Sequence, residues 1–239
     1  MPAGFQHPTD DAGRLLLCEY GAVFVARGGA RPPKTVVFKD EADVSAFQAR
    51  LEISSANIGG FDLELQAAAM ERLEKAIGEA AGKGLTVTPR SGDSARRSYD
   101  DTVSLWASRV GPALAHWVGQ GRLDRADADR IGGLSPFAQV PEIFALEARG
   151  MYCAKDLSKS IIYSVAPPGA SQHLSMLAFD VSEFNDPLVR EILAKHYWYR
   201  TVVSDLPHFT FLGAPETDLP GLGLKKAANE DRYFWLPDI

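Results

Sequence analysis

The chain has 239 residues, with 31 acidic and 25 basic side chains, a formal net charge of −6 and 46% hydrophobic residues. This apolar fraction is typical of a globular protein and excludes a disordered chain. Nucleic acid is not expected as a partner, since binding to a duplex depends on clustered Lys and Arg. With two cysteines, Cys18 and Cys153, the chain alone cannot form a disulfide framework or a four-cysteine zinc site.

Membrane and export signals are weak in this sequence. No stretch reaches the roughly 18 consecutive apolar residues of a membrane span. The apolar run 15–26 is interrupted by Glu19 and lacks a preceding basic segment, so it does not resemble a signal peptide. We expect no transmembrane segment. Two locations remain open: the cell envelope or periplasm if a leader is missing, and the cytoplasm otherwise.

The first quarter of the chain predicts a hairpin followed by a helix. Residues 15–26 and 35–38 are rich in Val and Phe and flank a Gly/Pro loop, which predicts a pair of strands. Residues 40–51 have apolar side chains at helical spacing and predict a helix. We therefore treat residues 1–60 as an N-terminal extension.

The middle of the chain is predicted to be mainly helical. A dense Ala, Glu, Leu and Met pattern predicts a helix over 61–81, and a short β-branched run predicts a strand over 85–88. Further helices are expected from about Ser98, where Pro112 should break or kink the helix, and over 125–131 and 137–149.

The last third changes character. Strands are expected over 160–165, 177–181 and 209–212, and a helix over 187–199 with Pro at its start. Helices early and short strands later predict an α+β fold with a small antiparallel sheet flanked by helices. We expect residues 61–239 to form the main domain, in one compact unit.

Two of the five histidines are candidates for a metal site. His173 and His208 lie beside predicted strands, and Asp180 lies within an apolar strand, where a carboxylate needs a cation, a metal or several donors. Two histidines and one aspartate suffice for a zinc ion that keeps its fourth position for water. Such residues occur in most chains, so their spacing alone also permits a structural role.

Three segments resemble motifs of the zinc D-alanyl-D-alanine metallopeptidases. Residues 171–180, Ser-Gln-His-Leu-Ser-Met-Leu-Ala-Phe-Asp, resemble the signature Ser-x-His-x-x-Gly-x-Ala-x-Asp. Residues 205–208, Asp-Leu-Pro-His, resemble the family's Glu-x-x-His. Residues 97–99, Arg-Ser-Tyr, resemble the same three residues of a family motif that enters a helix. The segments follow the family's order and span about half of the chain.

The resemblance implies a hedgehog- and lysostaphin-like zinc peptidase fold. It implies hydrolysis of D-alanyl-D-alanine-type peptide bonds in peptidoglycan metabolism, with a peptidoglycan peptide or a small peptide ending in D-Ala-D-Ala as the partner. The implied roles are zinc ligands for His173, Asp180 and His208, general base for Asp205, contact with substrate and oxyanion for Arg97, and substrate binding for Ser98, Tyr99 and Ser171.

Four positions depart from the family's pattern. Met176 stands where the signature has Gly, Arg96 where Tyr usually precedes the arginine, and Thr102 where Gln is frequent. Asp205 replaces Glu and is one methylene shorter. A displacement of about 1 Å in a catalytic group can lower the rate on the order of 100-fold, so the last departure bears directly on activity.

Two alternative functions stay open. A peptidoglycan endopeptidase of the same fold would cut an L-Ala–D-Glu or cross-bridge bond. A non-catalytic, zinc-stabilised binding module would keep the metal ligands without turnover. An open cleft with zinc-bound water beside Asp205 favours an enzyme, whereas a blocked fourth zinc position favours the binding module.

Overall fold

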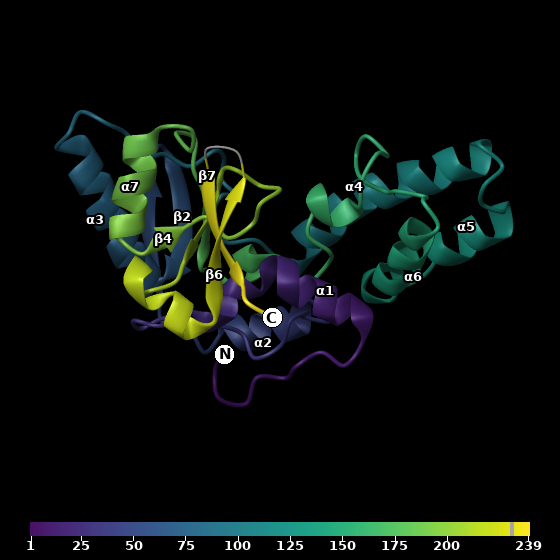
Figure 1. The fold of residues 1–239 in the computed structure, drawn as a ribbon, viewed down its shortest axis with the longest axis horizontal. Coiled ribbons are helices and arrows are strands. Elements are labelled where there is room, and N and C mark those ends of the chain that lie inside the picture. The colour runs from purple at the N-terminus through teal and green to yellow at the C-terminus, as the bar shows by residue number, and fades with distance from the viewer. Residues whose placement is uncertain (230–231) are drawn as a thin grey trace. The chain divides into compact units, whose positions relative to one another are not determined.

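A computed structural model describes residues 1–229 and 232–239 and shows the expected α+β class, with small antiparallel sheets flanked by helices (Figure 1). The contacts within the chain define two units. The first comprises residues 1–36, 45–97 and 172–239, and the second comprises residues 37–44 and 98–171. The boundary expected at residue 60 falls inside the first unit, in the turn of a hairpin.

The N-terminal strand pair is not present, and the prediction for it is wrong. Helix α1, Asp11–Tyr20, begins at Asp10, whose carboxylate accepts a hydrogen bond from a backbone N–H of the first turn at 2.8 Å. A 3-10 helix, Gly21–Val25, follows directly. The N-cap and the buried residues at helical spacing outweigh the β propensity of 15–26, and 35–38 lies in no strand.

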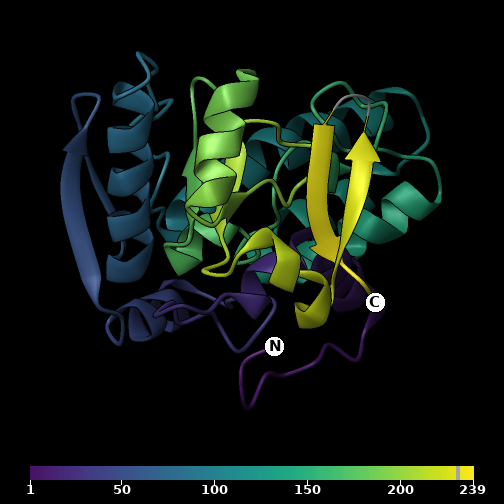
Figure 2. The same cartoon turned by 60° about the vertical axis from the view of Figure 1, so that its left-hand side comes forward.

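The helix expected from residue 61 begins later. The residues before it form β2, Phe61–Gln66, which pairs antiparallel with β1, Ile53–Ile58. The two leucines of β2 occupy alternate positions and are both buried, as the strand period requires. Helix α3, Ala67–Ala81, then confirms the remainder of the prediction and lies beside the hairpin (Figure 2).

The central sheet of the first unit has three antiparallel strands in the order β3–β5–β4. They span Ala178–Asp180 (β3), His208–Phe211 (β5) and Trp198–Tyr199 (β4). The strands expected at 177–181 and 209–212 are thereby confirmed. The register places Asp180 directly opposite His208 across the β3–β5 pair.

The second half of the chain differs from the expectation at two points. The helix expected over 187–199 is α7, Pro187–Lys195, and its last residues instead enter the short strand β4. A strand was expected over 160–165, but a 3-10 helix forms at Ile161–Tyr163. Both of its isoleucines are buried, so the apolar run reflects burial and not strand pairing.

A C-terminal hairpin was not anticipated from the sequence. Strand β6, Leu224–Asn229, pairs antiparallel with β7, Arg232–Pro237 (Figure 2). The sequence of β6 shows no strand period, because all five residues after Leu224 are exposed or half-buried. Trp235 of β7 packs in a buried cluster with Tyr199 and Leu212.

The second unit contains the three expected helices α4, α5 and α6, at Tyr99–Gly119, Arg125–Gly132 and Pro136–Ala148. Helix α4 begins with a capping box between Ser98 and Asp101. It continues through Pro112, so a break there is excluded. The helix expected over 40–51 is α2, Glu41–Gln48, whose residues are divided between the two units.

Among the described residues, the helices are all too short or too polar to cross a lipid bilayer.

Gly213 provides a test of packing behind the central sheet. It has φ +64°, and a Cβ at this position would lie 2.0 Å from the carbonyl oxygen of Arg27. Gly84 has φ +73° but open space around it. We expect Gly84→Ala to lose about 1 kcal/mol of unfolding free energy, and Gly213→Ala about 3 kcal/mol or more, because the backbone of Arg27 must move. Urea unfolding measures both, and equal losses would contradict this account.

Glu79 links α3 to the end of α7 and gives a pH-dependent test. Hydrogen bonds from Lys195 at 2.8 Å, from Lys83 at 3.0 Å and from His196 at 3.0 Å lower the pKa of Glu79 to about 2. A carboxyl whose folded pKa is depressed stabilises the fold above its unfolded pKa of 4.5, and this contribution is lost as the pH falls toward 2.

We therefore expect Glu79→Gln to be less stable than wild type at neutral pH, with the difference vanishing near pH 2. The matched control is Glu71→Gln, because Glu71 pairs only within α3, with Lys75 at 2.5 Å. Its effect should be smaller at neutral pH. Urea unfolding at the two pH values checks both variants, and a difference that is unchanged near pH 2 would refute the assignment.

Candidate metal centre

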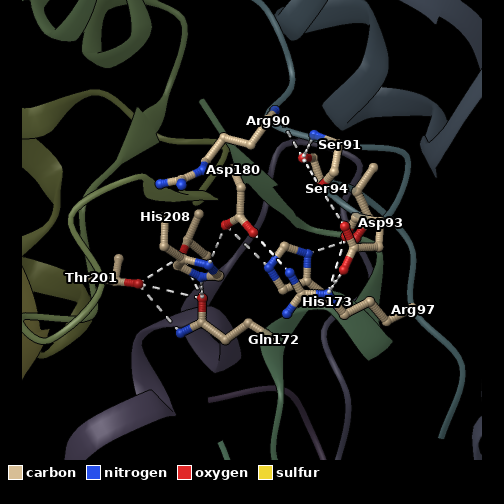
Figure 3. A network of polar contacts seen from close by, with 12 residues as sticks. Arg90, Ser91, Asp93, Ser94, Arg97, Gln172, His173, Asp180, Thr201 and His208 are labelled. Atoms are coloured by element: carbon tan, nitrogen blue, oxygen red, sulfur yellow. Dashed lines mark hydrogen bonds and ion pairs between the residues drawn. The ribbon is translucent and has the colours of Figure 1, made fainter. Parts of the chain in front are cut away.

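Three buried side chains of the first unit meet at one point (Figure 3). His173 lies on a 3-10 helix, Gln172–Ser175, Asp180 ends β3, and His208 begins β5. Their exposed fractions are 2%, 8% and 4%. One ligand atom of each lies within 4.8 Å of those of the other two. The structure therefore brings together the three residues expected as metal ligands.

The sheet register accounts for two of them. Asp180 and His208 are opposite residues of an antiparallel pair, whose side chains project from the same face with Cβ atoms about 4.5–5.5 Å apart. In this structure Nδ1 of His208 lies 3.2 Å from Oδ1 of Asp180. A shift of the register by one residue would move one of the two side chains to the other face.

The turn at Met176 brings in the third residue. The backbone N–H of Met176 donates to the carbonyl of His173 at 3.1 Å, and its own carbonyl accepts from the N–H of Gln66 at 3.1 Å. Met176 has φ +57° and is fully buried. A left-handed conformation costs a non-glycine residue roughly 1–2 kcal/mol. The signature that this segment resembles has Gly here, whereas this chain has Met in the left-handed region that favours Gly.

A loop packs along the edge of β3. The strand expected at 85–88 is replaced by a single bridge between Pro89 and Val181. Farther along, the N–H of Asp180 donates to the carbonyl of Ser94 at 2.9 Å. These bonds continue the sheet pattern and bring the following residues of the loop up to the metal ligands.

The protonation of His173 leaves a lone pair facing the site. Its Nδ1 lies 2.7 Å from the carbonyl oxygen of Ala95, which can only accept, so Nδ1 carries the proton. Its Nε2 lies 3.3 Å from Oδ1 of Asp180 but has no hydrogen-bond partner. Burial lowers the pKa of His173, against the opposing effect of Asp180, so the ring is neutral at neutral pH.

Asp180 is the negative group of the site. Burial raises the pKa of its carboxyl, whereas His173 and then His208 lower that pKa well below its usual value when their rings are protonated. Its other oxygen, Oδ2, accepts from Nη2 of Arg97 at 2.8 Å. One carboxylate oxygen, Oδ2, is thus paired with Arg97, and the other, Oδ1, faces the two histidines.

His208 lies between two oxygen atoms. Its Nδ1 faces Asp180, and its Nε2 lies 3.0 Å from the side-chain oxygen of Gln172. A neutral imidazole has one proton for these two acceptors. If the proton is on Nε2, a cation bound between Nδ1 of His208 and Asp180 would satisfy both of these atoms. Two imidazole nitrogens and one carboxylate oxygen form a donor set that suits zinc.

Arg97 contacts one of the three candidate ligands, Asp180, from outside. Besides its bond to Asp180, its Nε donates to the carbonyl of Asp93 at 3.1 Å and lies 3.5 Å from that residue's carboxylate. The side chain is 17% exposed, and Nη1 takes no part in these contacts. The structure thus places Arg97 where it fixes the orientation and charge of Asp180.

The remaining expected site residues lie elsewhere. Asp205 is exposed, in the turn before β5, and its backbone carbonyl accepts from the N–H of His208 at 3.2 Å. Its carboxylate is not part of the group of ligand atoms within 4.8 Å. Ser98, Tyr99 and Ser171 belong to the second unit, where Ser98 caps α4 and Tyr99 is its first residue.

Sequence reasoning missed Gln172 and Thr210. Gln172 lies inside the motif-like segment, directly before His173, and Thr210 lies two residues after His208 on the same face of β5. The period of the strand could have identified Thr210. The carbonyl of Ala95 offers no side-chain signal, because its role belongs to the backbone.

Neither a known protein family nor a curated protein matches this chain.

Zinc binding can be tested through stability. A ligand that binds only the folded state stabilises it by about 2.7 kcal/mol at 100 times its dissociation constant. We expect added zinc to raise the melting temperature of wild type, and to have little effect on Asp180→Asn, which lacks the charged ligand. His116→Gln is the matched control, since His116 lies on α4 outside the site. An equal zinc-induced shift in Asp180→Asn would contradict the assignment.

Proposed function

We propose that His173, Asp180 and His208 bind a zinc ion and that the chain is a zinc-dependent peptidase acting on D-alanyl-D-alanine-type peptides. One observation carries the metal assignment. The buried Nε2 of His173 lies without a hydrogen-bond partner 3.3 Å from a carboxylate oxygen that His208 also contacts. Unpaired acceptors in such a place are unfavourable unless a cation joins them.

The donor set fits zinc in a catalytic arrangement. Three protein ligands leave one position for water, and zinc when bound supplies a Lewis acid and a bound water with a pKa near ~7. The proton of His173 lies on Nδ1, toward the carbonyl of Ala95, so Nε2 is left as a donor for a metal, and the carboxylate of Asp180 is paired with Arg97.

Arg97 is proposed to have two roles, one in holding Asp180 and one in binding substrate. Its Nη2 and Nε hold the guanidinium against Asp180 and Asp93. Nη1 remains as a donor for the terminal carboxylate of a peptide or for an oxyanion that develops at the scissile carbonyl. The first role is supported by the contacts of the structure, and the second by the resemblance of residues 97–99.

Asp205 is proposed as the general base. It precedes the proposed ligand His208 by three residues and is exposed to solvent. A carboxylate in this position can accept a proton from the attacking water and deliver it to the leaving amine. The hydrogen bond from the N–H of His208 to the carbonyl of Asp205 keeps the turn against the strand.

The substrate class rests on the resemblance of three segments, 97–99, 171–180 and 205–208. Hydrolysis of a terminal D-Ala-D-Ala bond is the main proposal. An endopeptidase of the same fold, cutting within a peptidoglycan peptide, would use the same groups, and the two differ only in the space beyond the scissile bond. Release of free D-alanine distinguishes them.

A zinc-stabilised binding module is the second candidate, and the position of Asp205 favours it. The carboxylate is one methylene shorter than the family's glutamate and is exposed, while Arg97 is occupied by Asp180. A module of this kind would bind zinc and a carboxylate-ended peptide without cleaving it.

The deciding experiment is an assay of D-alanine release from a peptide ending in D-Ala-D-Ala, by the full chain with and without zinc. We expect zinc-dependent release by wild type and a decrease of about 100-fold or more in kcat for Asp205→Ala, since general bases contribute 10²–10⁴-fold. Zinc content should be unchanged in this variant. Asp218→Ala is the control, because Asp218 is another exposed aspartate.

The outcomes separate the candidates. Zinc binding without release from any terminal or cross-linked peptide would exclude the peptidase and leave the binding module. Release of a larger fragment without D-alanine would identify an endopeptidase. Activity of Asp205→Ala equal to that of wild type would remove Asp205 from the mechanism.

A further inference from the structure

We propose that Gln172 is a positioning residue of the metal centre, whose side-chain oxygen holds His208 in the tautomer that leaves Nδ1 to the metal. The inference rests on the proposed zinc site and adds a residue that the family resemblance does not include. Gln172 is 3% exposed and directly precedes the ligand His173, yet its side chain reaches the other histidine ligand (Figure 3). It contacts no reacting group.

The orientation of the Gln172 amide follows from a backbone group. Its Nε2 lies 2.9 Å from the carbonyl oxygen of Tyr20, the last residue of α1. A carbonyl oxygen only accepts, so the end of the amide that faces Tyr20 is the NH₂ group. The oxygen therefore faces Nε2 of His208, which must donate at this 3.0 Å contact.

Two threonines hold the same amide in place. The hydroxyl of Thr210 donates to the oxygen of Gln172, and the hydroxyl of Thr201 lies 2.6 Å from that of Thr210. The hydroxyl of Thr201 also lies 3.3 Å from the amide nitrogen. Both threonines are fully buried. The oxygen of Gln172 is thus a fixed acceptor in a closed polar network.

The oxygen of Gln172 and the carboxylate of Asp180 compete for the single proton of the His208 ring, from opposite sides. Oδ1 of Asp180 lies 3.2 Å from Nδ1 of His208 and would itself accept a proton there, which would block that nitrogen as a ligand. The bond to Gln172 keeps the proton on Nε2. Partners of this kind typically contribute 10–100-fold to metal affinity.

The network also makes the N-terminal helix a part of the metal centre. Tyr20 contributes its backbone carbonyl, at the end of α1, so this contact does not depend on the tyrosine side chain. The connection runs from this carbonyl through Gln172 to His208. Residues 11–20 therefore support the ligand geometry, although they contribute no ligand.

The test compares two buried glutamines. Gln172→Met removes the acceptor with little change in size. Gln48→Met is the matched control, since Gln48 is 5% exposed and donates to the carbonyl of Leu174 at 3.1 Å, on the same 3-10 helix, without touching a histidine. Competition with a chromophoric zinc chelator should show about 10–100-fold weaker zinc binding for Gln172→Met, and wild-type affinity for Gln48→Met.

A spectroscopic readout separates positioning from general stability. In protein labelled with ¹⁵N at histidine, two-bond proton–nitrogen correlations show which nitrogen of each ring carries the proton. We expect Nε2 of His208 to be protonated in wild type, with and without zinc, and the Nδ1-protonated form to increase in metal-free Gln172→Met. This measurement on wild type stands even if the variant does not fold.

Three results would overturn the inference: Nδ1 of His208 protonated in wild type, zinc bound through Nε2 of His208, or unchanged zinc affinity in Gln172→Met. The first two can be read in the wild-type protein. A wild type that binds no zinc would instead overturn the proposed function, and with it the role of Gln172. Zinc binding with the wrong tautomer would overturn the role of Gln172 alone.

Discussion

The pairing of β3 with β5 is the constraint on which the candidate centre depends. It places Asp180 opposite His208 and buries both on one face of a three-stranded sheet. A carboxylate buried in this way must be compensated, and the loop before Arg97 supplies the compensation by docking on the edge of β3. The side-chain contacts of the site therefore depend on the backbone hydrogen bonds that place these segments side by side.

Around that pair, each polar group has one defined partner on its outer side. The carbonyl of Ala95 fixes His173, the guanidinium of Arg97 fixes Asp180, and the amide of Gln172 contacts His208. The inner atoms of the three ligands are left facing one another. Outer partners that hold ligands in this manner are usual in protein metal sites. The centre is therefore organised as two layers: the three candidate ligands, and outside them the groups that orient their side chains.

The candidate ligands could be predicted from the sequence because it has only five histidines and because the motif-like segments order the three residues. An acid within an apolar strand, Asp180, was informative by itself. The outer layer could not be predicted, since Ala95 acts through its backbone and Gln172 through a contact set by folding. Residues 160–165 were assigned wrongly because a short apolar run fits a strand or a buried turn equally well. Residues 61–66 were joined to the following helix although their apolar side chains alternate with polar ones, which is the strand period.

The chain leaves the first unit directly after Arg97 and returns to it at Gln172. These two points lie close together, since the carbonyl of Ala95 is 2.7 Å from the ring of His173. Residues 98–171 are thus inserted into the scaffold at a nearly closed gap. The entropy of closing a loop grows only with the logarithm of its length, so a segment of very different size is tolerated at this point. A change in the length of this insert would therefore leave the β3–β5 register, which lies wholly in the first unit, in place.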